Sequence, residues 1–61
     1  MPVIRIEMIE GRTEEQKQRI AELVTKAMVE VAGVKSEETW VVFEDVSRGN
    51  WAVGGKLLSR R

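Results

Sequence analysis

The first nine residues constrain the fold most strongly, because hydrophobic side chains recur there at every second position. One face of this segment carries Pro2, Ile4, Ile6 and Met8, and the other carries Val3, Arg5, Glu7 and Ile9. A period of two, rich in β-branched residues, predicts a β-strand over residues 2–9 with one apolar face and one mixed face. The rest of the chain must therefore supply partners for this strand.

The pattern changes to a helical one after Gly11. Thr13 followed three residues later by Gln16 matches a capping box, so a helix is expected from residue 14. Gly33 suits the left-handed position that ends a helix, which predicts about nineteen helical residues over 14–32. The apolar residues expected to pack on a sheet are Ile20, Leu23, Val24, Ala27, Met28 and Val31. Two ion pairs, Glu15 with Arg19 and Glu22 with Lys26, are expected along this helix.

A second strand is predicted over residues 39–44, which are dense in β-branched and aromatic residues. Strand, helix and strand in this order predict a crossover unit with parallel strands, an α/β (α+β) fold. Two strands and one helix are too few elements to enclose a hydrophobic core. Residues 47–58 read as a turn, a short extended piece, a glycine pair and an apolar tail, and we expect them to form an arm that covers a neighbouring subunit.

The small size of the chain points to self-association. A protein of 61 residues usually needs disulfides, a metal or partner subunits, and this one contains no cysteine and no histidine. Ten basic and ten acidic residues give zero net charge, so no long-range field attracts nucleic acid or an anionic membrane. No apolar run approaches the roughly 20 residues of a membrane span, and no secretory leader is apparent. We expect a single-domain cytoplasmic protein over residues 1–61.

Few residues are candidates for catalysis or ligand binding, and Pro2 is the foremost of them. Removal of Met1 would convert Pro2 into a secondary amine and hence a base, whereas uncleaved Pro2 is a structural residue at a strand edge. Arg12 lies just before a helix N-terminus, where a guanidinium and backbone N–H groups can bind a carboxylate, although an isolated arginine there is more often a solvated turn residue. The Gly54-Gly55-Lys56 run lacks the spacing of a phosphate-binding loop.

Three blocks of sequence together resemble the 4-oxalocrotonate tautomerase family, also called 2-hydroxymuconate tautomerase. They are Met-Pro-Val-Ile at residues 1–4, Glu-Gly-Arg-Thr-Glu-Glu-Gln-Lys at 10–17 and Gly-Asn-Trp-Ala-Val-Gly-Gly-Lys at 49–56. The resemblance extends over essentially the whole chain. It implies the tautomerase fold, a β-α-β subunit with a short C-terminal hairpin, paired into a dimer, with three dimers assembled into a homohexamer.

The resemblance also implies an activity without cofactor or metal. Pro2 would be the general base that isomerises a small dienol carboxylate such as 2-hydroxymuconate. Arg12 matches the family arginine that binds the distal carboxylate, and Trp51 matches an aromatic residue that closes an apolar pocket. Both residues are expected to reach Pro2 from adjoining subunits.

The chain departs from the family pattern at Trp40, where well-known members carry a second substrate-binding arginine. Either Arg48 or Arg5 is a candidate replacement. Without one, we expect weaker activity on the diacid or a preference for monoacid enols such as 2-hydroxypenta-2,4-dienoate or phenylenolpyruvate.

Three alternatives differ in function rather than in substrate. Related haloacrylate dehalogenases need charged residues where this chain has Ile9 and Val53, so dehalogenation is not expected. A non-catalytic oligomeric scaffold that retains Met1 is the alternative from another class. Only the two terminal arginines support a nucleic-acid-binding function.

Overall fold

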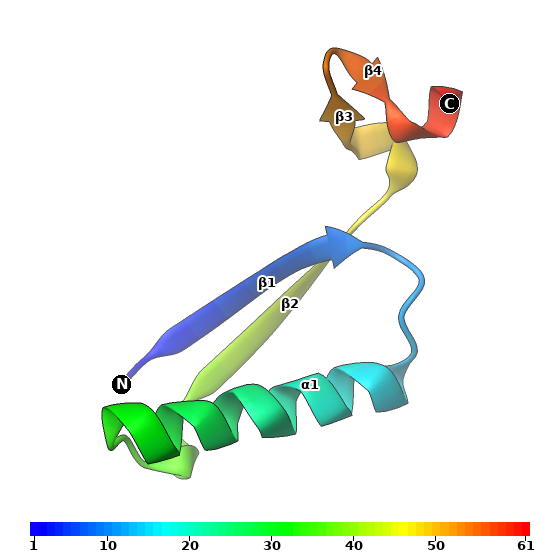
Figure 1. Ribbon diagram of the computed structural model, residues 1–61. Helices are drawn as coiled ribbons and strands as arrows, with labels where there is room; N and C mark the ends of the chain where they lie inside the picture. The colour runs from blue at the N-terminus through cyan, green and yellow to red at the C-terminus, as the bar shows by residue number, and fades with distance from the viewer.

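The computed structural model describes all 61 residues and shows a parallel β-α-β unit (Figure 1). Strands β1 (Val3–Ile9) and β2 (Trp40–Val46) form a two-stranded sheet, and α1 (Glu14–Ala27) connects them along one face. The register runs from Val3 opposite Trp40 to Ile9 opposite Val46. The predicted fold class and the order of its elements are confirmed.

The two faces of the sheet differ as the period of two predicts. Ile4, Ile6 and Met8 of β1 are half-buried beneath the helix, while Val3, Arg5 and Glu7 are exposed on the outer face. Strand β2 is longer than expected, because it continues through Asp45 to Val46. Asp45 is paired with Met8 in the sheet register, and its carboxylate forms an ion pair with Lys17 of α1.

The helix begins as predicted and ends differently. Thr13 accepts a hydrogen bond from the Gln16 N–H at 3.1 Å, and the Gln16 side chain accepts one from the Thr13 N–H at 2.9 Å, which completes the capping box. The regular α-helix stops at Ala27, and Met28–Ala32 form a π-helical turn. Gly33 then adopts the left-handed conformation, with φ 72°, that its position in the sequence predicts.

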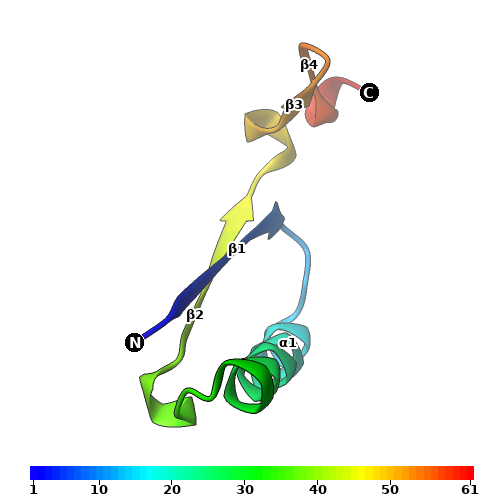
Figure 2. The ribbon, with the colours of Figure 1, turned by 60° about the vertical axis from the view of Figure 1, so that its left-hand side comes forward.

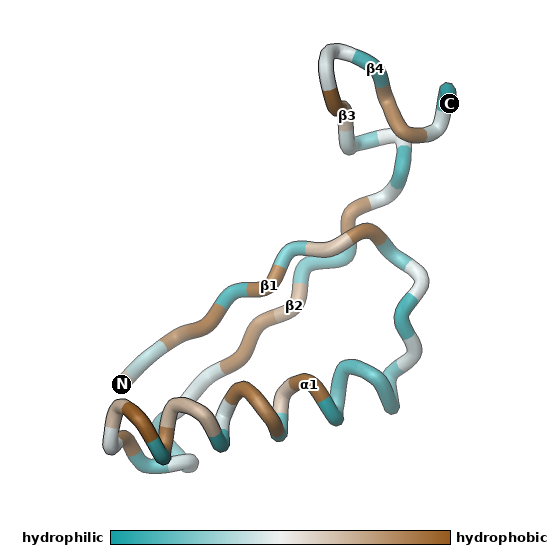
Figure 3. The backbone as a smooth tube through the Cα atoms, in the orientation of Figure 1, coloured by the Kyte–Doolittle hydropathy of each residue, from teal (hydrophilic) through white to brown (hydrophobic).

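The side of the helix that faces the sheet is only partly the predicted one. Ile20, Val24 and Met28 are half-buried against the strands, but Leu23 is 49% exposed and Val31 is 88% exposed. Exposed Leu23 shows that apolar residues of α1 extend beyond its sheet-facing side, and Figure 3 shows where the apolar positions fall along the helix. The predicted helical ion pairs are wrong, since the pairs that form are Arg19 with Glu22 at 3.3 Å and Lys26 with Glu30 at 4.0 Å.

Residues 47–61, which we call the arm, project from the C-terminal end of β2 and lie apart from α1 (Figures 1 and 2). The arm contains 3-10 turns at Arg48–Asn50 and Leu58–Arg60 and an antiparallel hairpin of β3 (Ala52–Val53) and β4 (Lys56–Leu57). Gly54 and Gly55 make the hairpin turn with φ values of 61° and 82°. The predicted C-terminal hairpin is therefore confirmed.

The isolated chain buries no residue. Its accessible surface is 4757 Å², against about 4,000 Å² for a compact monomer of this mass. Its radius of gyration is 14.6 Å, against about 10.5 Å for a compact chain of this length. A single copy thus leaves its apolar faces open and its arm extended.

Candidate active site

Pro2 lies immediately before β1 at the start of the parallel sheet. Its carbonyl oxygen accepts a 3.0 Å hydrogen bond from the backbone N–H of Trp40, the first residue of β2. Proline has no backbone N–H to donate, so the sheet holds this residue only through its carbonyl. The ring nitrogen takes no part in the sheet, which leaves it available for chemistry if it is freed from Met1.

Trp40 presents a large exposed aromatic surface at the same end of the sheet. Its side chain shares the outer face with Val3, its register partner, and the two residues are 52% and 55% exposed. Two apolar side chains are therefore open to solvent within one residue of Pro2. They form an apolar surface next to the candidate base.

Arg12 lies at the opposite end of the sheet, in the loop that joins β1 to α1. The Glu10 N–H donates to the Val46 carbonyl at 3.0 Å, which extends the sheet by one bond, and Gly11 then turns the chain with φ 129°. Arg12 is exposed, and its guanidinium has no ion-pair partner in the chain. It is a free cation beside the start of the helix.

Trp51 belongs to the arm, where its carbonyl accepts a 2.9 Å hydrogen bond from the Leu58 N–H. The indole is half-buried and borders a shallow hollow of about 290 Å³ between the outer face of the sheet and the base of the arm. The residues around this hollow are Glu7, Val46, Asn50, Trp51 and Ala52. Trp51 is thus held by the arm rather than by the sheet.

One chain does not bring the predicted site residues together. Strand β1 alone spans about 20 Å, and Pro2 precedes it while Arg12 follows it. Figures 1 and 2 place the N-terminus at one end of the sheet and the arm with Trp51 beyond the other. Of the predicted site residues, the structure joins only Pro2 and Trp40.

Neither candidate for the missing second arginine adjoins Pro2 within the chain. The Nη1 atom of Arg5 pairs with Oε1 of Glu44 at 3.3 Å on the outer face of the sheet. Arg48 lies in the arm, where its Nη2 atom donates to the Leu58 carbonyl at 3.5 Å. Arg5 is therefore occupied by a carboxylate, and Arg48 belongs to the same projecting segment as Trp51.

The largest hollow on the chain lies elsewhere. It measures about 480 Å³ and is open along the flank of α1 and the turn at Ser36, without any predicted site residue in its lining.

No helix of the chain is both long enough and apolar enough to span a membrane.

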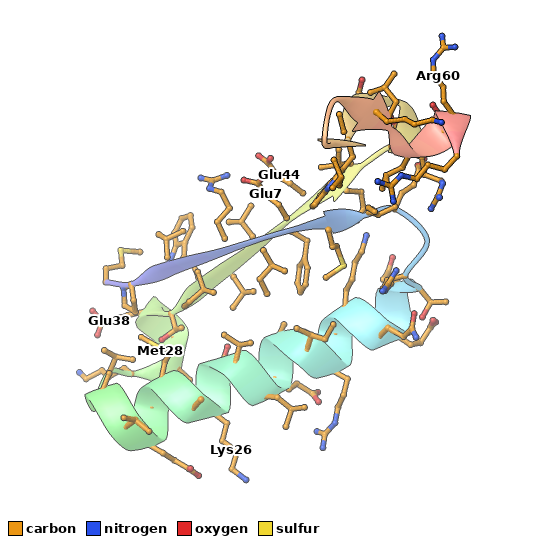
Figure 4. All side chains as sticks on the ribbon, turned by 45° about the horizontal axis from the view of Figure 1, so that its top comes forward. Glu7, Lys26, Met28, Glu38, Glu44 and Arg60 are labelled. Carbon is orange, nitrogen blue, oxygen red and sulfur yellow. The ribbon has the colours of Figure 1, made fainter.

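Sequence reasoning attached no role to the turn before β2, which the structure places beside Pro2. Ser36–Glu38 form a 3-10 turn that leads through Thr39 to Trp40. Figures 1 and 4 show this turn at the same end of the sheet as the first residues of β1. The available signal was the pair of acidic residues directly before the second strand.

Comparison with known proteins establishes the family. The family described as Tautomerase enzyme matches residues 2–61. A probable tautomerase of Bacillus cereus is 49% identical over 59 residues, 97% of each chain, and a 2-hydroxymuconate tautomerase of Bacillus subtilis is 42% identical over 97% of this chain and 95% of its own.

Solved structures agree with the sequence relatives. A crystal structure of a 4-oxalocrotonate tautomerase homologue superposes with a TM-score of 0.95 at 33% identity, covering 100% of this chain and 97% of the other. A heterohexameric 4-oxalocrotonate tautomerase from Chloroflexus aurantiacus superposes with a TM-score of 0.88 at 32% identity, covering 97% and 95%. The fold and these matches define a small isomerase. The chain belongs to the tautomerase family.

Proposed function

We propose that this protein is a cofactor-independent enol–keto tautomerase that converts 2-hydroxymuconate-like dienols into conjugated 2-oxo-3-enoates, with Pro2 as general base. The observation that carries the proposal is the position of Pro2 in a tautomerase-family chain: it is tied to the sheet only through its carbonyl. The name of the Bacillus subtilis relative supports the choice of a 2-hydroxymuconate-like substrate.

The reaction needs a base that accepts a proton at oxygen and returns it at carbon. Once Met1 is removed, the Pro2 amine takes the proton of the 2-hydroxyl group and the O–H electron pair becomes the C2=O bond. The C2=C3 pair moves to C3=C4, and the C4=C5 pair takes a proton from the Pro2 ammonium at C5. Atoms and electrons balance without an oxidant, so the step requires only a positioned acid–base group.

Arg12 from an adjoining copy supplies the carboxylate contact in this proposal. A guanidinium makes two parallel hydrogen bonds to a carboxylate, and Arg12 has no competing acid in its own chain. A nearby cation and apolar walls both disfavour the protonated form of an amine, and a base that works at neutral pH must be largely unprotonated. One arginine thereby binds the substrate and tunes the base.

Trp51 from a neighbouring arm closes the pocket. An indole over the site excludes water, which strengthens the attraction between Arg12 and the substrate carboxylate. Its other role is packing between subunits, and one position serves both roles because the site lies at an interface.

Self-association completes the site. Pro2 lies at the opposite end of the sheet from Arg12 and the arm with Trp51, so a site that contains all three requires more than one copy. The absence of any buried residue, together with exposed Leu23, Trp40 and Val53, supports an assembly in which several faces are covered. We propose a homohexamer of three dimers, in keeping with the hexameric architecture named for the Chloroflexus aurantiacus relative.

Trp40 favours monoacid enols as a second candidate substrate class. It stands where the resemblance expects a second arginine, and its exposed indole offers apolar surface beside Pro2 instead of a charge. A substrate with one carboxylate and an apolar or aryl end, such as phenylenolpyruvate, matches one cation and one aromatic wall.

Ultraviolet-monitored ketonisation of 2-hydroxymuconate and phenylenolpyruvate tests the proposal. The protein must first show by intact mass that Met1 is absent. We expect Pro2→Ala to lower kcat/KM by about 10²–10⁴-fold, the range for loss of a general base. With Met1 removed from each protein, equal catalysed rates for Pro2→Ala and the native protein would reject Pro2 as the base. Native rates no higher than the uncatalysed rate on both substrates would reject the tautomerase assignment and favour the scaffold.

A further inference from the structure

One ion pair joins the helix to the sheet. Of the four ion pairs in the chain, only that between Lys17 of α1 and Asp45 of β2 connects these two layers. Its side chains are 24% and 40% exposed, whereas both side chains of every other pair are more than half exposed. Because water and salt weaken exposed ion pairs, the Lys17–Asp45 pair is the least screened of the four.

Neither residue of this pair suits its own element. Lys17 lies in the first turn of α1, where the helix dipole favours acidic rather than basic side chains. Asp45 lies in β2, although aspartate is depleted from strands. Each residue is therefore unfavourable where its own element is concerned, and each finds its partner in the other element.

The same strand holds both sides of the loop that carries Arg12. This loop, residues 10–13, leads from the end of β1 to the start of α1 (Figure 1). On its first side, the Glu10 N–H donates to the Val46 carbonyl of β2 at 3.0 Å. On its second side, Asp45 holds the start of the helix through Lys17. Two consecutive residues of β2 therefore restrain the loop from both directions.

Lys17 connects the sheet to the residue that follows Arg12. Its backbone N–H donates to the Thr13 carbonyl at 3.1 Å, and its side chain pairs with Asp45. Thr13 is held a second time by its capping box with Gln16. The ion pair thus completes a closed ring of contacts around Arg12, in which every other link is a backbone hydrogen bond or the chain itself.

Gly11 is the part of the loop that most needs this restraint. Its φ of 129° lies in a region that favours glycine, and glycine changes backbone conformation more freely than any other residue. No atom lies within 4 Å of the place where its Cβ would be, so packing does not restrain it. Arg12 itself is exposed and forms no ion pair. The direction of its side chain therefore depends on how the two sides of the loop are held.

We propose that Lys17 and Asp45 are positioning residues that hold the loop so that the Arg12 guanidinium is directed at the substrate carboxylate. This inference rests on the proposed function, in which Arg12 supplies the carboxylate contact, and neither Lys17 nor Asp45 touches the substrate. Without the ion pair, the loop is held to β2 only through Glu10. The guanidinium then samples a wider range of positions and binds the carboxylate more weakly.

Lys17→Met and Asp45→Asn test the proposal, because each removes one charge and keeps the side chain close to its native size. Lys17→Arg is the conservative variant that retains the cation. Arg19→Met with Glu22→Gln is the matched control, since it removes an ion pair that lies entirely on α1. Circular dichroism and sedimentation velocity show which variants fold and assemble, and Asp45→Asn decides the matter if Lys17→Met does not fold.

Steady-state kinetics on 2-hydroxymuconate measures the effect on binding. We expect Lys17→Met and Asp45→Asn to raise KM about tenfold with little change in kcat, since displacing a binding group by about 1 Å can cost up to about 10²-fold. Lys17→Arg and the control should keep the native KM. Native KM values in both Lys17→Met and Asp45→Asn would overturn the proposal.

A double-mutant cycle with Arg12→Ala distinguishes positioning from a general effect on the fold. If the ion pair acts through Arg12, Lys17→Met and Asp45→Asn should have no further effect on KM once Arg12 is alanine. A merely structural role would raise KM by the same factor with and without Arg12. That additive result would also overturn the proposal.

A measurement without turnover separates this inference from the proposed function. NMR relaxation of the Gly11 and Arg12 amide nitrogens should show more motion on the ps–ns timescale in Lys17→Met and Asp45→Asn than in the native protein and the control. If the native protein turns over no enol above the uncatalysed rate, the proposed function fails, while relaxation still decides whether the pair holds the loop. Unchanged relaxation and native KM values in variants of an active protein would reject only the positioning.

Discussion

The backbone N–H of Trp40 donates a 3.0 Å hydrogen bond to the carbonyl oxygen of Pro2, and this bond ties the start of β1 to the start of β2. It holds the proposed base by its carbonyl and leaves the ring nitrogen unbonded. The same bond places an exposed indole one register position from Pro2. One backbone contact thus fixes the proposed base, Pro2, and the exposed indole of Trp40 beside each other.

Arg12→Ala should lower kcat/KM by about 10–150-fold, the cost of a lost hydrogen bond to a charged group. The guanidinium is exposed and unpaired, so the substitution should leave folding unchanged. Steady-state kinetics measures the effect, with Arg19→Ala as the control on the solvent side of α1. Activity of Arg12→Ala equal to that of the control would remove Arg12 from the site.

Trp40→Arg should shift the preference toward diacids. Adding a guanidinium beside Pro2 supplies the second carboxylate contact, and we expect the ratio of kcat/KM for 2-hydroxymuconate over phenylenolpyruvate to rise about tenfold or more. Trp40→Ala is the control, because it removes the ring without adding a charge. An unchanged ratio in Trp40→Arg would show that position 40 does not contact the substrate.

Thr13→Ala should destabilise the protein by about 1 kcal/mol per subunit, as loss of an N-cap usually does. The Thr13 hydroxyl satisfies the Gln16 N–H at 3.1 Å, and alanine leaves that donor unpaired. Urea unfolding followed by circular dichroism at fixed protein concentration measures the change. Thr13→Ser, which retains the hydroxyl, should lie within a few tenths of a kcal/mol of the native protein.

Ser36→Ala should raise the pKa of Glu37 toward its ordinary value. The Ser36 hydroxyl is the largest cause of the lowered pKa, because it donates a hydrogen bond to the ionised carboxylate. A carboxyl whose pKa is lowered in the folded state adds stability above its unfolded pKa, and that stability is lost as the pH falls through the folded pKa. Titration of the Glu37 carboxyl carbon by NMR in both proteins measures the shift, and coincident curves would exclude the hydroxyl as its cause.

The sequence pattern correctly predicted those features of the helix and strands that depend on residues close to one another in the chain. Thr13 and Gln16 form the expected capping box, and Gly33 ends the helical segment in the left-handed conformation. The alternation in residues 2–9 gave the correct inner and outer faces of β1. These features depend on neighbours a few residues away, so the sequence contains the information.

Features that depend on distant contacts were harder to predict. Strand β2 reaches Val46, where the Val46 carbonyl bonds to the Glu10 N–H and Asp45 pairs with Lys17 of α1, and both contacts join residues far apart in sequence. Leu23 and Val31 follow the helical period, yet they point away from their own sheet. Periodicity identifies an apolar face without saying whether the same chain or another copy covers it.

The choice of site residues came from the family resemblance more than from the local sequence pattern. Pro2, Arg12 and Trp51 are far apart in the sequence and in the isolated chain, and nothing in their spacing indicates that they meet. Their assignment to one site stays a prediction, which requires that copies assemble so that the two ends of the sheet come together.

Subunit complementation tests this central claim most directly. Pro2→Ala and Arg12→Ala proteins are mixed in equal amounts, unfolded and refolded together, and assayed for ketonisation beside each parent treated alone. If each site takes Pro2 from one copy and Arg12 from another, about one quarter of the sites in the mixed oligomers regain both residues, and activity should return to roughly that fraction of the native value. Activity no higher than that of the two parents would contradict a site shared between subunits.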